Sequence, residues 1–160
     1  MPRIKIENFY MRTALNVAEL SYAVKKKVGC IVVKDGTIIS FGYNGTPAGL
    51  DNCCEEKVEQ NNDFIIENDK GRYVGDLTLK TKANVIHAEM NALGKLAKST
   101  LSSEGAEMFL TLAPCHSCAT GIIASGIKRV YYYELYKSDE GIKTLQNAGI
   151  EVIFLNTVSI

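Results

Sequence analysis

The chain has 160 residues, 46% of them hydrophobic, which suits a single domain (1–160) with one buried core. Eighteen basic residues balance eighteen acidic residues. This balance argues against the broad positive surface that nucleic-acid binding needs, so we expect no nucleic-acid partner. The sequence shows no signal-like segment and no run of about 18 apolar residues. With five cysteines, an odd number, these features indicate a cytoplasmic protein that does not bind membranes.

The first part of the chain predicts a helix followed by a β-hairpin. Apolar residues recur at helical spacing over residues 9–24, without an internal Gly or Pro. Two β-rich runs within residues 28–44 flank Asp35-Gly36, a dipeptide that favours the positive φ angles of a tight hairpin turn. The acidic segment that follows, residues 51–86, is interpreted as a partly irregular and partly helical insertion.

Three alternations of helix and strand complete the chain. Helices are expected over residues 87–98, 114–126 and 138–149, and strands over residues 107–112, 128–135 and 151–155. The short helix between the last two strands permits a parallel pair joined by a right-handed crossover. The order of elements predicts an α/β sandwich with a sheet of about five strands.

Two pairs of metal-binding or acidic residues lie at the starts of consecutive predicted helices. His87 and Glu89 open one helix, and Cys115 and Cys118 open the next. Crossover helices on one face of a sheet bring such N-termini together, and a helix N-terminus stabilises thiolates. Two thiolates and one imidazole form a tetrahedral zinc site with one open position, which is a catalytic arrangement. Two residues on a regular helix lie about 200° apart, so one amphipathic face cannot contain both His87 and Glu89, and the pair points toward chemistry.

Other interpretations of the cysteines remain open. A redox C-x-x-C pair would need neither the histidine nor the glutamate, and a closed structural zinc site would need a fourth protein ligand. His116 lies between the two cysteines and is expected to point away from the ion. Cys53 and Cys54 lie in a segment without histidine, so we expect them to pack in a loop rather than to bind a second zinc.

The combination of H-A-E at 87–89 with P-C-H-S-C at 114–118 resembles the cytidine/deoxycytidylate deaminase family. The stretches "GYNGTPAG", "NCC", "IHAEMNAL" and "SGIKRVYYYELY" are similar to its deoxycytidylate (dCMP) branch, including bacteriophage forms. The resemblance spans about residues 9–155. It implies a three-layer α/β/α cytidine deaminase-like fold, with a mixed sheet and helices on both faces. It also implies hydrolytic deamination of dCMP to dUMP, in the host cytoplasm if the protein is phage-encoded.

The resemblance assigns roles to individual residues. Glu89 would take a proton from water, deliver it to N3 of cytosine and later protonate the departing amino group. Asn44 would bind the deoxyribose 3′-hydroxyl, and the backbone around Ala88 and Ala113 would read the pyrimidine edge. Tyr136 would pack near the base or phosphate. Phosphate needs positive charge, and the nearest candidates are Lys25, Lys26 and Lys27. Of these, Lys27 matches the basic position of the family before V-G.

The resemblance also implies regulation and assembly. It predicts a hexamer that is activated by dCTP and inhibited by dTTP, with Mg²⁺ accompanying the triphosphate. Tyr43, Gly45 and Lys98 are the expected effector contacts. Two alternatives stay open: a related zinc deaminase acting on cytosine, cytidine, guanine or tRNA adenosine, and a catalytically silent relative that only binds nucleotides or protein partners.

Overall fold

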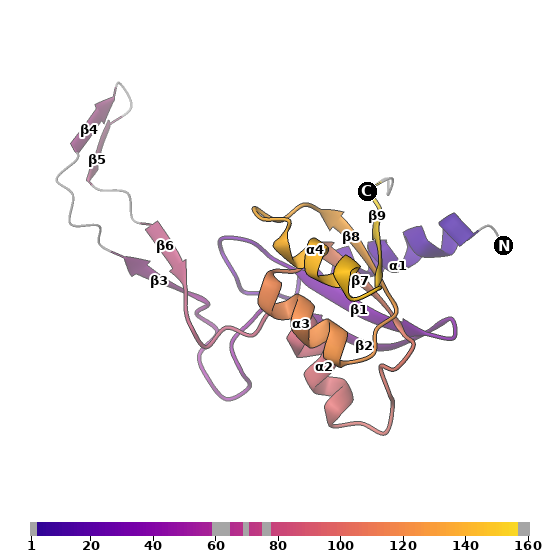
Figure 1. Ribbon diagram of the computed structural model, residues 1–160. Coiled ribbons are helices and arrows are strands. Elements are labelled where there is room, and N and C mark those ends of the chain that lie inside the picture. The colour runs from indigo at the N-terminus through magenta and orange to yellow at the C-terminus, as the bar shows by residue number, and fades with distance from the viewer. Residues whose placement is uncertain (1–2, 59–64, 69–70, 75–77, 157–160) are drawn as a thin grey trace.

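The computed structural model describes residues 3–58, 65–68, 71–74 and 78–156 (Figure 1). In chain order the elements are α1 (Arg3–Ala18), β1 (Gly29–Lys34), β2 (Thr37–Tyr43), β3 (Glu55–Val58), β4 (Ile65–Asn68), β5 (Gly71–Val74), β6 (Thr78–Thr81), α2 (Ala88–Ala97), β7 (Glu107–Leu112), α3 (His116–Ala124), β8 (Arg129–Glu134), α4 (Glu140–Asn147) and β9 (Glu151–Phe154). None of these helices is both long and apolar enough to span a membrane.

A five-stranded mixed sheet forms the centre of the molecule, in the order β2-β1-β7-β8-β9. Strand β1 is antiparallel to both of its neighbours, whereas β7, β8 and β9 are parallel. The two parallel pairs are joined through the short helices α3 and α4. The predicted five strands and the parallel pair at the C-terminal end are therefore confirmed.

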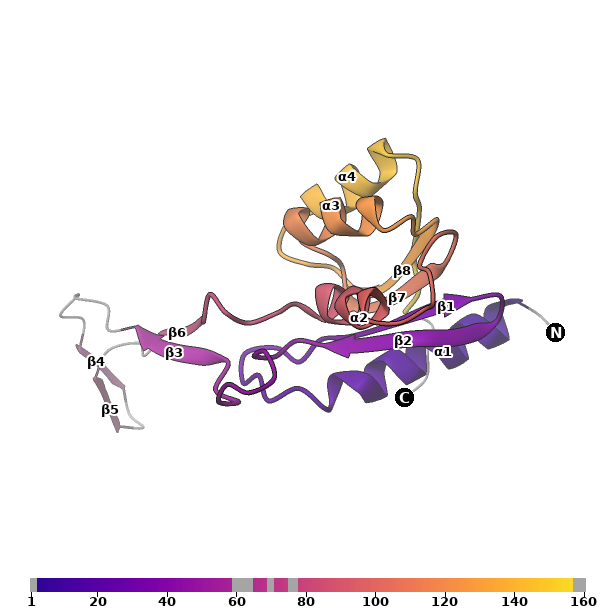
Figure 2. The ribbon, with the colours of Figure 1, turned by 90° about the horizontal axis from the view of Figure 1, so that it is seen from below.

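Helices cover both faces of this sheet, which gives the expected three-layer α/β/α fold. Helix α1 lies on one face, and α2, α3 and α4 lie on the other (Figure 2). Successive side chains of a strand point to opposite faces, so each strand contributes to both cores. Tyr131 of β8 stacks on Phe109 of β7 beneath α1, with ring centroids 4.3 Å apart, whereas Tyr132 packs into the opposite core.

The hairpin of β1 and β2 turns where its sequence indicated. Asp35 and Gly36 both have positive φ, at 49° and 76°, as a two-residue turn of this type requires. The bounds of α1 differ from the predicted 9–24 at both ends. The helix begins earlier because Arg3 in its first turn is bonded to the sheet. A turn follows Ala18, and Ser21, Val24 and Lys25 then bond to residues far along the chain instead of continuing the helix.

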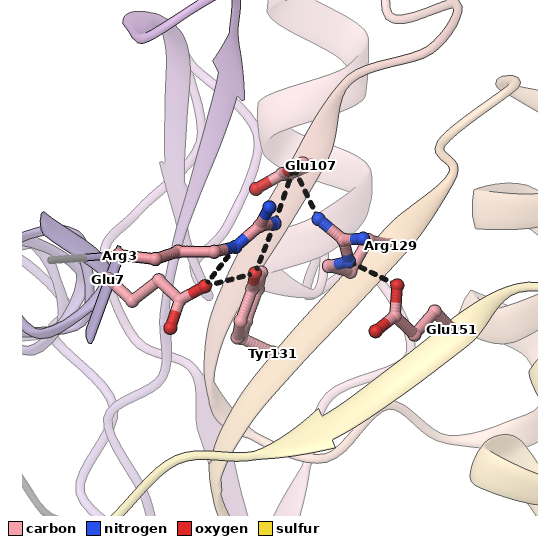
Figure 3. A network of polar contacts seen from close by, with 6 residues as sticks. All are labelled: Arg3, Glu7, Glu107, Arg129, Tyr131 and Glu151. Atoms are coloured by element: carbon pink, nitrogen blue, oxygen red, sulfur yellow. Dashed lines mark hydrogen bonds and ion pairs between the residues drawn. The ribbon is translucent and has the colours of Figure 1, made fainter.

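The first turn of α1 is held by a polar network with residues of β7 and β8 (Figure 3). Arg3 pairs with Glu7 at 2.6 Å and with Glu107 of β7 at 3.2 Å. The Tyr131 hydroxyl donates to Glu7 at 2.8 Å and accepts from Arg3. Burial and the Glu7 carboxylate raise the pKa of Tyr131 above its usual range. Arg129 of β8 extends the network by donating to Glu107, so the network joins α1, β7 and β8.

The acidic insertion leaves the sheet as two antiparallel strand pairs, β3 with β6 and β4 with β5. Both pairs project away from the three-layer body (Figures 1 and 2). The expectation that this segment is partly helical is wrong for its described residues. Isoleucine, valine, threonine and tyrosine are frequent in these strands, and such residues favour extended backbone. The paired strands β3 and β6, which join the insertion to the body, are called the arm base.

Candidate active site

His87, Cys115 and Cys118 form a cluster of three metal ligands, although 28 residues separate the first two. Their ligand atoms lie within 4.8 Å of one another. The His87 Nδ1 atom is 3.3 Å from the Cys118 sulfur and 3.7 Å from the Cys115 sulfur. Ligands bound at about 2.0–2.3 Å to one tetrahedral ion are roughly 3.6 Å apart. The cluster therefore fits a zinc ion, and it leaves the fourth position for a non-protein ligand.

Each half of the cluster is built at a helix boundary. His87 is the N-cap of α2 and has extended backbone, with φ −68° and ψ 155°, whereas Glu89 lies in the first helical turn. The angle of about 200° between helical residues therefore does not apply to this pair, and the change of conformation directs the two side chains to different positions. Cys115 is the N-cap of α3, and its sulfur accepts the Cys118 N–H at 3.5 Å. This capping contact brings the two cysteines together.

Two glycines allow neighbouring elements to approach the ligand-bearing helix ends. A Cβ atom at Gly42 of β2 would lie 2.3 Å from the Ala88 carbonyl oxygen, so a glycine is required for α2 to rest on the strand. A Cβ atom at Gly141 of α4 would lie 2.0 Å from the Pro114 carbonyl oxygen. The start of α4 therefore packs directly on the chain that leads into Cys115.

Glu89 is buried beside this cluster and lines the same cavity. Burial raises the pKa of its carboxyl, while its own backbone N–H, His87 and the Cys118 thiol act in the opposite direction. Burial and the Glu89 carboxylate likewise raise the pKa of the Cys118 thiol. At Cys118 the effect of burial on the thiol pKa thus outweighs the effect of the helix N-terminus. A divalent cation bound to the sulfur would favour the thiolate instead. The donor set consequently suits a cation.

A cavity of about 260 Å³ opens beside the cluster. Four of the five predicted substrate-binding residues line it: Asn44, Ala88, Ala113 and Tyr136. This volume is near the lower end of the roughly 300–1,000 Å³ that is usual for ligand sites. The cavity is therefore suited to one small ligand.

Lys27 is the exception, because it does not line the cavity and its ammonium group pairs with Glu19 at 3.1 Å. The basic residues that do line the cavity are Lys25, Lys26 and Lys137. The Lys26 ammonium group pairs with Glu134 at the end of β8. The geometry thus offers neighbouring lysines, rather than Lys27, to an anionic group of a substrate.

Asn44 has a second task that the sequence did not indicate. Its side-chain oxygen accepts the Val28 N–H at 2.8 Å, and its side-chain nitrogen donates to the Lys26 carbonyl at 2.8 Å. One amide N–H and one oxygen lone pair remain for a ligand. Asn44 therefore holds the loop before β1 while it faces the cavity.

The three predicted effector contacts, Tyr43, Gly45 and Lys98, line a different cavity of about 470 Å³. Lys95 lines it too, and its ammonium group lies 3.8 Å from the centroid of the Phe41 ring. Burial and the nearby Lys98 charge lower the pKa of Lys95. Two lysines that repel each other in one cavity are suited to an anion.

Three contributors to the site were missed in the sequence. Glu55 of β3 lines the first cavity and accepts backbone N–H groups from the loop after α1. The Asn91 side chain donates to the Tyr43 carbonyl at 2.8 Å and ties α2 to the end of β2. The Ser21 hydroxyl donates to the Asn44 carbonyl at 2.7 Å. Each bond joins residues at least 23 positions apart, so no local pattern could have revealed them.

His116 takes no part in the cluster, as expected. Its Nδ1 atom lies 3.0 Å from the Thr144 hydroxyl of α4. Cys53 is exposed, and its thiol donates to the Glu55 carbonyl at 3.1 Å. In the part of the chain that the structure describes, the three residues at 87, 115 and 118 are the one group with metal-ligand geometry.

Comparisons with known proteins agree with this site. The model of the cytidine and deoxycytidylate deaminase zinc-binding region matches residues 4–134. The chain is 39% identical to the deoxycytidylate deaminase of Enterobacteria phage T4, over 89% of this chain and 86% of that protein. It is 33% identical to the deoxycytidylate deaminase of Saccharomyces cerevisiae, over 91% of this chain and 43% of that protein.

Among solved structures, the dCMP deaminase of cyanophage S-TIM5 in complex with dCMP and dUMP is similar at a TM-score of 0.77 and 40% identity. The match covers 96% of this chain and 98% of the cyanophage chain. The region that matches the family model, residues 4–134, contains the three ligands and Glu89. By sequence, by fold and by the geometry of its metal ligands, the chain belongs to the cytidine and deoxycytidylate deaminase family.

Proposed function

We propose that the protein catalyses the zinc-dependent hydrolytic deamination of dCMP to dUMP, which supplies dUMP for dTTP synthesis. The observation that carries the proposal is the cluster of His87, Cys115 and Cys118 beside the buried Glu89, at a small cavity bordered by lysines. Several relatives that match most of this chain are deoxycytidylate deaminases, and the similar cyanophage enzyme was solved with dCMP and dUMP bound.

The groups around the cavity have separate roles in the reaction. Zinc, when bound, lowers the pKa of a water molecule and so supplies hydroxide near neutral pH. Glu89 takes the water proton and delivers it to N3 of the cytosine. It then takes the proton of the new C4 hydroxyl group and passes it to the departing amino group. Its burial suits this exchange, because a raised pKa lets the carboxyl both accept and return a proton.

Backbone groups at the cavity are suited to read the base. Ala88 is the first residue of α2, and the first N–H groups of a helix have no partner within it. This N–H can donate to the O2 atom of cytosine. Ala113 donates its own N–H to the Glu134 carbonyl at 2.8 Å, so its carbonyl is the group it offers to the 4-amino substituent. Asn44, with one free amide N–H, faces the deoxyribose 3′-hydroxyl.

The decisive experiment compares the wild-type protein with Glu89→Gln. We expect the variant to keep its zinc and its fold while dCMP turnover, followed by ultraviolet absorbance, falls by roughly 10²–10⁴-fold. Glutamine has nearly the same shape and cannot carry the proton. Undiminished turnover in a zinc-loaded Glu89→Gln protein would refute the assigned role.

A substrate panel separates dCMP deamination from its alternatives. We expect dCMP to be turned over with the highest kcat/KM, above cytosine, cytidine, guanine and a tRNA substrate, because lysines border a cavity of mononucleotide size. A catalytically silent relative would bind dCMP without releasing ammonia, and it would have no need of a carboxylate at position 89.

Regulation by nucleotides belongs to the same proposal. The cavity lined by Tyr43, Gly45 and Lys98, with Lys95 beside them, is the candidate site for dCTP, accompanied by Mg²⁺, and for dTTP. Gly45 exchanges two backbone hydrogen bonds with Ile86, the residue before the ligand His87. An effector could thereby influence the metal site. The protein is further proposed to act in the cytoplasm as a hexamer.

Titration of dCTP and dTTP against dCMP velocity, with the assembly mass measured alongside, tests this regulation. We expect dCTP to raise the velocity at low dCMP and dTTP to lower it. Replacing Lys98 with Ala should weaken both effects and leave the basal velocity unchanged. Velocities insensitive to both triphosphates would exclude the regulatory part and leave the catalytic part intact.

A further inference from the structure

We propose that Glu55 of the arm base is a positioning residue: it holds the loop that presents Lys25 and Lys26 to the phosphate of the substrate. The inference rests on the proposed function, because it concerns how dCMP is recognised. It also gives the insertion a specific role in the recognition of the phosphate.

The loop in question, residues 22–27, has little structure of its own. It follows α1, lies in no helix or strand, and exposes the side chains of Tyr22 and Val24 to solvent. A segment with few packed side chains keeps one conformation only if its backbone groups are bonded from outside. Lys25 and Lys26, both of which line the substrate cavity, belong to this loop.

Glu55 supplies such bonds from outside. Its side-chain Oε1 atom accepts the N–H of Val24 at 2.9 Å and the N–H of Lys25 at 3.1 Å. The residue is only 8% exposed. Burying a carboxylate is costly unless it is hydrogen-bonded, and bonds to an ionised acceptor are roughly twice as strong as neutral ones. The two N–H groups therefore stabilise the buried carboxylate. The carboxylate in turn fixes the orientation of the two N–H groups, and so of the loop backbone.

Further hydrogen bonds hold the backbone on either side of the same residues. Asn44 accepts the Val28 N–H and donates to the Lys26 carbonyl, and the Ser21 hydroxyl accepts the Ala23 N–H at 3.1 Å. With Glu55 bonded at Val24 and Lys25, the backbone is held before, at and after the two lysines. Within the arm base, Glu55 is held in register opposite Thr81 of β6.

The direction in which dCMP binding changes when the carboxylate is removed distinguishes a positioning role from a direct electrostatic one. A carboxylate that simply faced the cavity would repel a phosphate, so its removal would tighten the binding of dCMP. A carboxylate that holds the lysines in place has the opposite consequence. Its removal lets the loop move and weakens the binding of phosphorylated ligands alone.

The test compares Glu55→Ala and Glu55→Gln with the control Glu56→Ala. Glu56 follows on the same strand, is exposed and carries the same charge. We expect Glu55→Ala to raise KM for dCMP roughly tenfold while kcat stays within about twofold and zinc content is unchanged. Glu55→Gln keeps an acceptor oxygen, so its KM should rise less, and Glu56→Ala should match the wild type.

A second measurement isolates the phosphate. Inhibition constants are determined for dUMP and for deoxyuridine, which differ only by that group. We expect Glu55→Ala to raise the constant for dUMP by the same factor as KM and to leave that for deoxyuridine unchanged. If the alanine variant does not fold, Glu55→Gln gives the same test with a smaller shift.

The outcomes are distinct. A KM for dCMP that is unchanged or lowered in both Glu55 variants overturns the positioning role, as does an equal rise for dUMP and deoxyuridine. A wild-type protein that fails to turn over dCMP defeats the proposed function instead.

Discussion

His87 and Glu89 perform different tasks because a helix begins between them. The extended backbone of His87 directs its Nδ1 atom to the sulfurs, and the first helical turn places Glu89 in the cavity. Within a regular helix, a spacing of two residues would direct the two side chains to nearly opposite sides. At an N-cap it separates the metal ligand from the proposed proton carrier, while both line the same cavity.

Removal of one sulfur tests the metal site at this scale. We expect Cys118→Ser to lose most of its zinc and its activity, because a serine hydroxyl is a poor ligand for zinc beside one thiolate and one imidazole. The matched control is Cys53→Ser, since Cys53 is exposed and lies outside the cluster. Metal analysis of both purified proteins gives the answer, and a Cys118→Ser protein with full zinc would show that the ion is held elsewhere.

The ligands and Glu89 could be predicted from sequence because each half of the site is local, with ligands at an N-cap or in a first helical turn. Lys27 shows the limit of such reasoning. Which of three consecutive lysines borders the cavity depends on loop bonds to Asn44 and Glu55, residues 16 to 31 positions away from the groups they bind. No motif encodes those bonds.

At the scale of elements, the close approach of α2 to β2 determines where the metal ligands lie. Gly42 makes this approach possible, because any side chain there would collide with the backbone of Ala88 and Ala92. The alternation of helix and strand was predictable from hydrophobic periodicity and turn residues. The bounds of α1 were not, because the network around Arg3 and the loop bonds after Ala18 depend on residues far along the chain.

A pair of glycine substitutions tests the role of this contact. We expect Gly42→Ala to lower the free energy of unfolding by about 1–3 kcal/mol and to reduce zinc affinity, because α2 must shift. Gly94→Ala, on the exposed side of the same helix, has no atom within 4 Å of the new methyl group. It should raise stability by up to about 1 kcal/mol. Denaturant unfolding measures both changes, and equal stability of the two variants would contradict the role of Gly42.

At the scale of the whole molecule, the three-layer body carries the chemistry and the insertion contributes through its base. Cys54, Glu55, Thr81 and Val85 line the substrate cavity. Strands β4 and β5 lie at the far end of the insertion, away from the three-layer body (Figure 1). The sequence identified the insertion by its charge. Its strands were missed because segments of only four residues give a weak periodic signal.

Shortening the insertion tests whether it contributes to the site only through its base. Val58 and Thr78 are register partners, so an Asn-Gly turn could replace residues 59–77. We expect the shortened protein to bind one zinc and to keep kcat for dCMP within roughly threefold, because the cavity-lining residues remain. Its assembly mass, measured in parallel, shows whether the insertion serves oligomerisation. A folded, zinc-loaded but inactive product would contradict the division.

The origin of the metal ligands on two separate helices has a further consequence. An ion held by His87 on α2 and by the cysteines on α3 cross-links the chain across 28 residues, much as a disulfide would. Closing such a loop removes conformational entropy from the unfolded chain, and binding only to the folded chain adds stability by mass action. Chelation would thus loosen the junction of the two helices as well as stop the reaction, so heat resistance and catalysis depend on the same ion.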